Sequence, residues 1–381
     1  MSPISLVSFI ALIVLSSCSG SDDLDDGLSG EGVQIGEVRS YATHLEENTL
    51  TRAWTPPTGY VAYEDGDQPI AIAFTQDAQT PKMGHFFKSN GKWRTSLGEI
   101  SAADYYLYGF IPNLPVIKYS ITDWNGGDTD GEKNAEYSKG AIMTLQDVPT
   151  VMDKDFCVVI GAKDGSNKET VNSPGLNKGD FKYKASAITK DGGEGNFVFL
   201  LFDHLYAALR INMKVYDNEY ADLRKIKLKS LQLNTIQTGD VKTTQKNNIT
   251  ITLNHTDGGR ADAIESIEYS PTGAAIDGGI EFWSSTSGEW LTAEFSTYDG
   301  YFMPQNVNTL VLTSIYDVYD RKGNLIRENC KVTNSALLSN LLTGQTETER
   351  GKRYTINMTI QPTYQYQLSN WDLDDPTVII N

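Results

Sequence analysis

The sequence is poor in the residues that most often bind metals. It contains only three cysteines and four histidines among 381 residues. Protein zinc sites are built mainly from Cys and His, so the sequence predicts no metal site and no cofactor. Cys157 and Cys330 lie 173 positions apart and give no disulfide framework. Two buried free thiols are the favoured interpretation, and a disulfide between them is the alternative.

Positive charge is also scarce. The 32 Lys and Arg face 49 Asp and Glu, for a formal net charge of −17 with no basic stripe, which argues against a nucleic-acid partner. There is no Gly-x-Ser-x-Gly nucleophile motif either. We therefore expect no catalytic residues. A glycosidase stays open as a third-ranked function, because its two carboxylates can lie far apart in sequence.

The N-terminal apolar run, Ile4–Leu15, is too short to span a bilayer and fits the core of a signal peptide. It ends in Leu15-Ser16-Ser17-Cys18, which resembles a lipobox, the motif whose cysteine is acylated in bacterial lipoproteins. We therefore expect a signal peptide over 1–17 and lipid attachment at Cys18. No Lys or Arg precedes the run, which departs from the usual pattern. A plain secretory signal is the alternative.

Four aspartates stand within five positions after Cys18, at residues 22, 23, 25 and 26. Such a density of like charge repels itself and favours a solvated tether. A calcium loop would need a Gly turn and a downstream Glu at fixed spacing, and these are missing.

The pattern of the rest of the chain predicts short strands separated by Gly- and Asp-rich turns. Residues 210–215 and 354–360 alternate apolar and polar side chains, as a strand with one buried face does. The alternation slips near Lys229 and Ser230, which predicts a β-bulge. Gly323 predicts a hairpin after residue 319. A few short helical turns are expected around Asn334–Leu342.

These patterns predict an all-β protein with two antiparallel β-sandwich domains in tandem and few short helices. A chain of this length exceeds a single core. We place the acidic tether and a propeptide strand at 18–52, the N-terminal sandwich at 53–195 and the C-terminal sandwich at 196–381.

Several motifs together resemble the fimbrillins, the subunits of type V pili. They are the lipobox with its acidic tether, Leu50-Thr51-Arg52-Ala53, the stretch from Phe202 through His204 to Ile211, and the tail from Gly351 to Asn381. The resemblance extends over residues 18–381 and implies transthyretin-like sandwiches. It also implies an adhesive pilus subunit at the outer membrane and cell surface, held by lipid, with other pilus subunits as partners.

The same resemblance implies how such a subunit would mature and assemble. A trypsin-like protease would cut between Arg52 and Ala53, releasing a first strand that includes residues 33–38. A neighbouring subunit would then donate its C-terminal strand, here Thr377, Val378, Ile379 and Ile380, to the vacated groove. An ordinary last strand within its own domain is the alternative for these four residues.

The runner-up function is a carbohydrate-binding surface lipoprotein that does not polymerise. Trp283 and Trp290 flank a polar stretch and are the candidates for stacking on a host glycan; a host protein is the other adhesion target considered. Asp203 and His204 are neighbours, which on a strand point to opposite faces. We therefore expect His204 to pack at a sheet edge and to form local hydrogen bonds instead of joining a catalytic pair.

Overall fold

The computed structural model describes residues 35–47, 60–63, 66–98, 100–124, 135–165, 175–186, 196–237, 241–256, 262–276, 278–304, 306–341, 346–361 and 377–380. Within these ranges nearly all regular structure is β-strand, arranged in four sheets, and the helices are α1 (Asn218–Leu223) and α2 (Leu338–Leu341). The predicted all-β class is confirmed. Neither of these helices has the length and apolar character needed to cross a membrane.

Two sheets enclose the first of two buried apolar clusters, and we call this pair the first sandwich. Its larger sheet runs in the order β3-β1-β13-β11-β7-β4-β5-β6, with β12 beside β7. The bounds are β1 (Ile35–Thr43), β3 (Tyr60–Ala62), β4 (Ile70–Thr75), β5 (Lys82–Ser89), β6 (Lys92–Thr95), β7 (Ala103–Ile111), β11 (Cys157–Gly165), β12 (Lys182–Ala185) and β13 (Asn196–His204). The opposing sheet holds β8 (Lys118–Asp123), β9 (Gly140–Pro149), β17 (Thr244–Asn254) and β18 (Ile264–Ala275).

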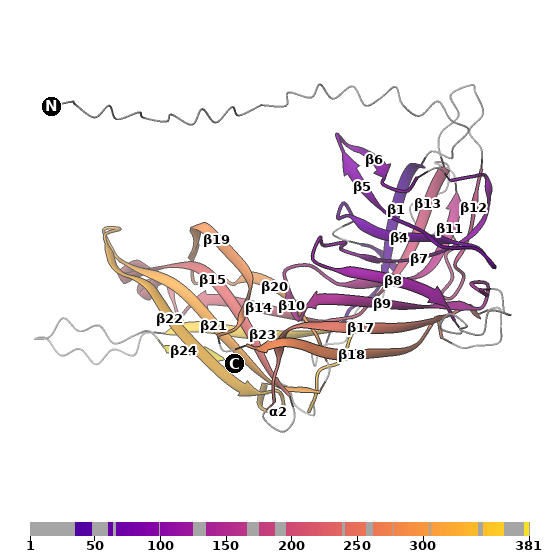
Figure 1. Ribbon diagram of the computed structural model, residues 1–381. Coiled ribbons are helices and arrows are strands. Elements are labelled where there is room, and N and C mark those ends of the chain that lie inside the picture. The colour runs from indigo at the N-terminus through magenta and orange to yellow at the C-terminus, as the bar shows by residue number, and fades with distance from the viewer. Residues whose placement is uncertain are drawn as a thin grey trace, which may run out of the picture.

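The other two sheets enclose the second apolar cluster and form the second sandwich, on the left in Figure 1. One sheet contains β2 (Glu46–Glu47), β10 (Val151–Met152), β14 (Ala207–Val215), β20 (Ser296–Phe302), β23 (Lys352–Gln361) and β24 (Thr377–Ile380). The other contains β15 (Arg224–Gln237), β16 (Val241–Lys242), β19 (Ile280–Leu291), β21 (Val307–Asp320) and β22 (Leu325–Leu337).

Strand formation follows the side-chain pattern in β14, one of the strands expected from alternation. Leu209, Ile211 and Met213 point into the second apolar cluster and are almost fully buried. Arg210, between them, faces outward, and its guanidinium donates two hydrogen bonds of 2.8 Å to the carboxylate of Asp299 on β20. The period of two therefore decides which face of the strand is buried.

Local irregularities also lie where the sequence places them, with one exception. The register of β15 against both neighbours shifts between Leu228 and Ser230, which confirms the bulge. Gly323 adopts φ +86° in the turn between β21 and β22, as the hairpin requires. The helical turns expected around 334–342 are wrong for the first part, where residues 334–337 pair with β21, and are confirmed at α2.

The chain passes repeatedly between the two sandwiches. The hairpin β17–β18 belongs to the first sandwich, although β15 and β19 on either side of it in sequence belong to the second. Conversely, β10 pairs with β20 of the second sandwich. The predicted domain boundary after residue 195 falls directly before β13, and these segments cross it. Figure 1 shows β17 and β18 alongside β9.

The pairing is antiparallel with three exceptions among the described strands. β1 is parallel to β13, β14 is parallel to β23, and the short β2 is parallel to β23. The cysteines of the two cores, Cys157 and Cys330, are both buried and neither forms a disulfide, so the favoured interpretation of two buried thiols is confirmed.

Candidate functional site at the first strand

The first described strand, β1, precedes Arg52 and is inserted into the larger sheet of the first sandwich. It lies between β13, to which it is parallel, and β3, to which it is antiparallel. Four of its apolar side chains are buried in the first apolar cluster: Ile35, Val38, Tyr41 and Ala42. The segment before Arg52 thus contributes both backbone pairing and core volume.

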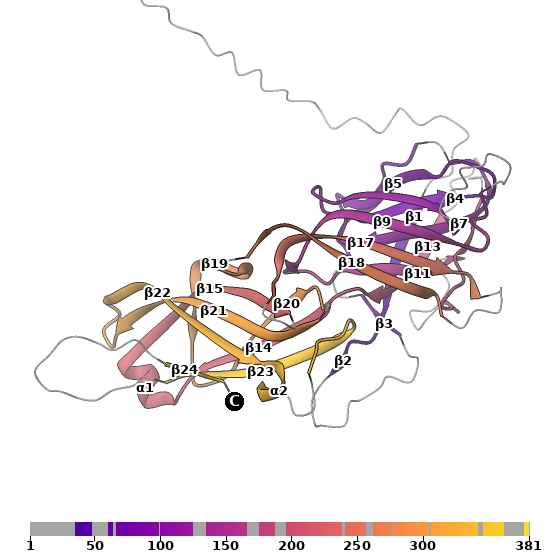
Figure 2. The same cartoon turned by 60° about the horizontal axis from the view of Figure 1, so that its bottom comes forward.

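The same segment then reaches the second sandwich. After two further residues, Glu46 and Glu47 form β2, which pairs with the start of β23. The backbone N–H of Glu46 donates a 2.8 Å hydrogen bond to the carbonyl of Gly351. Figure 2 shows β2 beside β23. Residues 35–47 therefore form backbone hydrogen bonds with strands of both sandwiches.

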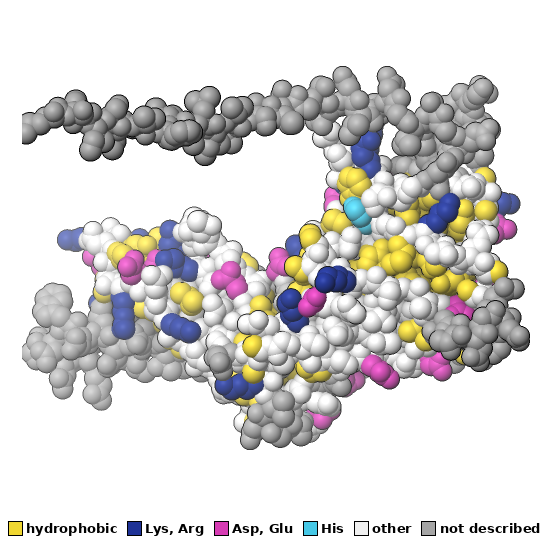
Figure 3. All heavy atoms as spheres, viewed as in Figure 1, with side chains coloured by type: hydrophobic (Ala, Val, Ile, Leu, Met, Phe, Trp, Pro, Cys, Tyr) yellow, Lys and Arg dark blue, Asp and Glu magenta, His cyan; other side chains and the backbone are white. Residues whose placement is uncertain are grey.

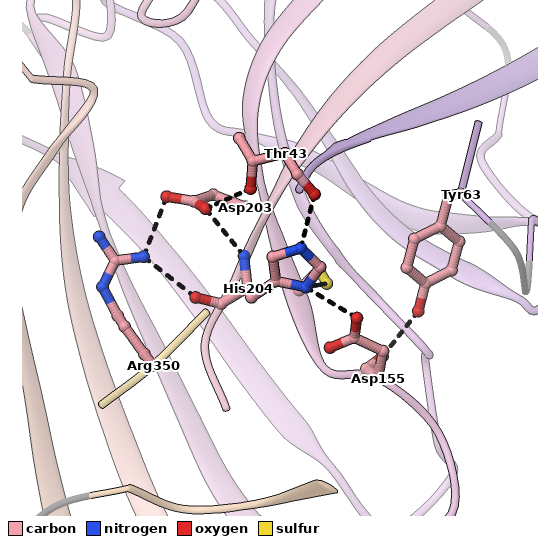
Figure 4. A network of polar contacts seen from close by, with 7 residues as sticks. Thr43, Tyr63, Asp155, Asp203, His204 and Arg350 are labelled. Carbon is pink, nitrogen blue, oxygen red and sulfur yellow. Dashed lines mark hydrogen bonds and ion pairs between the residues drawn. The ribbon is translucent and has the colours of Figure 1, made fainter. Parts of the chain in front are cut away.

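A buried polar network fastens the end of β1, and His204 is at its centre (Figure 4). His204 Nε2 lies 2.7 Å from the carbonyl oxygen of Thr43, the last residue of β1. His204 Nδ1 lies 2.7 Å from Asp155 Oδ2 and 3.4 Å from Cys157 Sγ. Neither a carbonyl nor a carboxylate oxygen can donate a hydrogen bond, so both ring nitrogens must carry protons. The geometry therefore assigns a charged imidazolium.

The electrostatics agree with this assignment. Burial alone lowers the pKa of His204, but the charge and hydrogen bond of Asp155, together with the Thr43 carbonyl, outweigh burial and raise that pKa above its ordinary value. Burial, reinforced by Asp155, raises the pKa of Cys157 well above its usual range. Cys157 therefore remains a thiol beside an imidazolium–carboxylate pair.

Asp203 makes a second set of contacts on the opposite face of β13. Its carboxylate accepts hydrogen bonds from the Thr43 hydroxyl at 2.6 Å and from Arg350 Nη1 at 2.9 Å. Burial would raise the pKa of Asp203, but the Arg350 charge and the Thr43 hydrogen bond lower it below its usual value. Arg350 also donates to the carbonyl of His204 at 3.0 Å. Because Arg350 stands just before β23, the network joins β1, the first sandwich and the second.

The network is suited to holding a strand and unsuited to catalysis or metal binding. Cys157 is fully buried and protonated, so it is neither accessible nor a thiolate nucleophile. Asp155, Cys157 and His204 bring three donor atoms within 4.8 Å of one another. Both nitrogens of His204, however, direct N–H groups at oxygen acceptors, which leaves no lone pair for a cation. What the arrangement can do is bind the Thr43 end of β1.

Sequence reasoning found only part of this site. It noted Asp203 and His204 and placed their side chains on opposite faces, as observed. The expected sheet-edge position of His204 is wrong, because β13 lies between β1 and β11. Its backbone N–H donates a local hydrogen bond to Asp203 at 3.0 Å, whereas its ring partners are Thr43 and Asp155, at sequence separations of 161 and 49. Thr43, Asp155 and Arg350 were missed, and no motif marks them.

The predicted lipid-attachment residue Cys18 and the predicted processing residues Arg52 and Ala53 lie outside the described residues. The predicted donor segment forms β24, which pairs antiparallel with the end of β23, from Met358↔Ile380 to Gln361↔Thr377. In this structure the segment is therefore paired within its own second sandwich. β2 and β24 pair with opposite ends of β23, which β14 covers along its other side.

The two tryptophans predicted to stack on a ligand do not form one platform. Trp283 is half-buried and packs against the second apolar cluster, with its ring 4.6 Å from that of Tyr298. Trp290 is 45% exposed, with its ring 4.9 Å from that of Tyr319. A bulge in β19 between Ser284 and Glu289 separates them.

No protein-family model and no curated protein sequence matches the chain. The solved structures to which it is similar include a fimbrial protein from Bacteroides vulgatus, with 11% sequence identity over 92% of this chain and 99% of that one and a TM-score of 0.33. They also include the fimbrial anchor protein Mfa2 from Porphyromonas gingivalis, with 9% identity over 90% of this chain and 97% of that one and a TM-score of 0.23. The solved structures to which the chain is similar are fimbrial proteins and putative cell adhesion proteins, at low sequence identity.

Proposed function

We propose that the chain is a structural and adhesive subunit of a type V pilus, made as a precursor whose first strand is removable. One observation carries the proposal: β1 precedes Arg52, yet it forms an internal strand of the first sandwich and buries Ile35, Val38 and Tyr41. A cut after Arg52 would separate β1 and β2 covalently from the rest of the chain. The fimbrillin resemblance of the Leu50–Ala53 motif supports that position for the cut.

Loss of β1 would leave the first sandwich incomplete. The edge of β13 that now pairs with Ile35–Ala42 would have open backbone groups, and the apolar side chains beneath β1 would face solvent. Unpaired buried backbone groups are costly, so such a groove favours capture of another strand. A strand from a second subunit would satisfy both requirements and link the two chains.

In this proposal Thr377–Ile380 is the donated strand. In this structure it pairs with β23 through four residue pairs, fewer than the eight pairs between β14 and β23. A short ladder exchanges more readily than a long one. The proposal further includes export as a lipoprotein acylated at Cys18, which places the precursor at the outer membrane before it joins a fimbrium on the cell surface.

Limited digestion with an arginine-specific protease tests this function. The wild-type chain should yield a product beginning at Ala53 and then a ladder of multimers that resists mild denaturation. An Arg52→Ala variant should stay monomeric, and a chain shortened before Thr377 should be cut but form no ladder. A stable, trimmed monomer of the wild-type chain would contradict assembly and favour the second candidate.

That second candidate is a carbohydrate-binding surface lipoprotein that does not polymerise. The specific observation in its favour is the exposed ring of Trp290 beside Tyr319. Binding to glycans by a chain that forms no multimers after cleavage would decide for it.

A further inference from the structure

A basic and aromatic surface lies at the end of the second sandwich that is farthest from the first sandwich. We call it the Trp290 face and define it by Lys225, Lys227, Trp290, Tyr319 and Leu325. The Trp290 and Tyr319 ring planes meet at 66°, and Lys227 Nζ lies 5.1 Å from the centre of the Trp290 ring. In Figure 3, Lys and Arg side chains are mixed with hydrophobic ones over this part of the molecule.

Strand register puts these side chains on one outward face. On β15, Ile226 and Leu228 are fully buried, so Lys225 and Lys227 point the other way. Cross-strand neighbours share a face, and the ladder pairs Lys227 with Trp290, Lys225 with Tyr319, and Tyr319 with Leu325. The face is therefore built on three adjacent strands and the edge strand β22.

Two carboxylates, Asp317 and Asp320, also lie near the face. Asp317 accepts from the backbone N–H of Asn329 at 2.8 Å and pairs with Lys229 at 3.3 Å. Asp320 accepts two hydrogen bonds of 2.8 Å from Asn324, and these hydrogen bonds lower its pKa. Lys225, by contrast, is exposed and makes no ion pair with any other residue that the structure describes. Lys229 balances Asp317, and Lys225 and Lys227 together outnumber Asp320, so positive charge exceeds negative charge among these residues even though the whole chain carries −17.

Exposed apolar side chains concentrate at the same end of the molecule. Of nine large apolar side chains that are exposed within the described residues, four lie on or directly beside the strands that carry the face: Leu223, Trp290, Leu325 and Ile326. Large exposed apolar patches bordered by polar residues mark interaction sites. The remaining question is which kind of partner the chemistry fits.

We propose that the Trp290 face binds an acidic polysaccharide, with a sugar ring against Trp290 and sugar carboxylates at Lys225 and Lys227. The C–H groups on one side of a pyranose ring form an apolar, slightly positive surface that complements the negative face of an aromatic ring. Ammonium groups beside the ring attract the acidic substituents. The cores of protein–protein interfaces are depleted in lysine, whereas here the lysines adjoin the aromatic rings, so the pattern favours a charged glycan over a protein.

The open form of the face fits a polymer better than a small ligand. The residues stand on a sheet surface and on the edge strand β22, so an extended chain can lie across several strands and engage repeated sugar units. The binding does not depend on cleavage after Arg52, and it is compatible with either assembly state. Its failure would therefore leave the strand-release proposal intact, and the reverse also holds.

The test is a binding titration of the intact chain with polygalacturonate, with neutral dextran and polyaspartate as comparison polymers. Polygalacturonate should bind, dextran should bind far more weakly, and polyaspartate should not match polygalacturonate because it lacks sugar rings. Trp290→Ala should weaken binding by about tenfold or more, as for an aromatic anchor. Lys225→Gln with Lys227→Gln should weaken binding and reduce its dependence on salt concentration.

A matched control comes from the same sandwich. Phe295 is also exposed and also lies beside a lysine, with Lys214 Nζ 4.8 Å from its ring centre, but that lysine belongs to the opposite sheet. Phe295→Ala should leave binding unchanged, and the melting temperature of each variant verifies folding. The proposal is overturned if polygalacturonate does not bind, if polyaspartate binds equally well, if Phe295→Ala weakens binding as much as Trp290→Ala, or if the face binds only a protein.

Discussion

Replacing His204 by Asn or by Gln removes one of its two ring hydrogen bonds and keeps the other, because each amide places a donor near the position of only one ring nitrogen. The Asn amide nitrogen lies near the position of Nδ1 and can still donate to Asp155, but it cannot reach the Thr43 carbonyl. The Gln amide nitrogen lies near the position of Nε2 and can still donate to Thr43. His204→Asn therefore removes the contact that holds the end of β1, and His204→Gln keeps it.

The expected magnitude follows from the character of the lost bond. His204 is 3% exposed and its 2.7 Å contact with Thr43 is made by a charged donor. A hydrogen bond to a charged group contributes about 1.5–3 kcal/mol. Since about 1.4 kcal/mol corresponds to a factor of ten, a cut chain carrying His204→Asn should release the segment ending at Arg52 about 10- to 100-fold faster. His204→Gln should release it more slowly than His204→Asn, because its neutral amide keeps the hydrogen bond to Thr43 without the charge, although the unpaired Asp155 lowers global stability.

The assay is native mass spectrometry of the chain cut after Arg52, which follows loss of the N-terminal fragment over time. Glu37→Gln is the control, because it breaks the partly exposed ion pair with Arg39 on β1 itself, and such pairs contribute only about 0.2–1 kcal/mol. Equal release rates for His204→Asn and His204→Gln would refute the reasoning. So would a control variant that releases the fragment as fast as His204→Asn.

Three further predictions concern the same fold. The pKa of His204 is raised in the folded chain, so the stabilisation that its charged ring gives to the folded state is complete below the ordinary pKa of about 6.5 and is lost as pH rises through the raised value. The cut fragment should therefore dissociate faster at about pH 9 than at about pH 6. A dissociation rate that does not change with pH would contradict this. Cys157 and Cys330 should react with a thiol reagent only after unfolding, and failure to react in denaturant without reductant would indicate a disulfide instead. Gly140→Ala should lower the free energy of unfolding in urea by about 1–3 kcal/mol, because Gly140 has φ +144° and a Cβ there would lie 2.0 Å from a carbonyl oxygen of β17. Gly98→Ala is the control: a Cβ at Gly98 would meet open space, so the free energy of unfolding should change little.

The sequence was informative wherever a local rule decides the structure. Alternation identified β14 and β23, the slip in alternation identified the bulge at Lys229 and Ser230, and Gly323 identified a hairpin. The helical turns expected around 334–342 form only at α2, because a tertiary contact outweighs the local pattern in the first part. Asn334 and Leu337 pair with β21, and that ladder extends β22 through residues that could share a helical face.

Pairing between strands that are distant in sequence could not be predicted from local sequence patterns. Nothing in the apolar pattern of residues 35–43 specifies that β1 is parallel to β13, and nothing in β17 specifies β9 as its neighbour. The polar network has the same origin, since Thr43, Asp155 and Arg350 meet His204 only after both sandwiches have formed. The opposite orientations of Asp203 and His204 were predictable, because neighbouring residues on a strand point to opposite faces.

The repeated passage of the chain between the sandwiches has a mechanical consequence. Among the described strands it crosses seven times: from β1 to β2, β2 to β3, β9 to β10, β10 to β11, β13 to β14, β16 to β17 and β18 to β19. Two bodies joined by a single linker would swing under flow, whereas seven connections share a pulling force and resist bending between them. Release of β1 and β2 after a cut at Arg52 removes two of these seven, and the five that remain keep most of the resistance to bending.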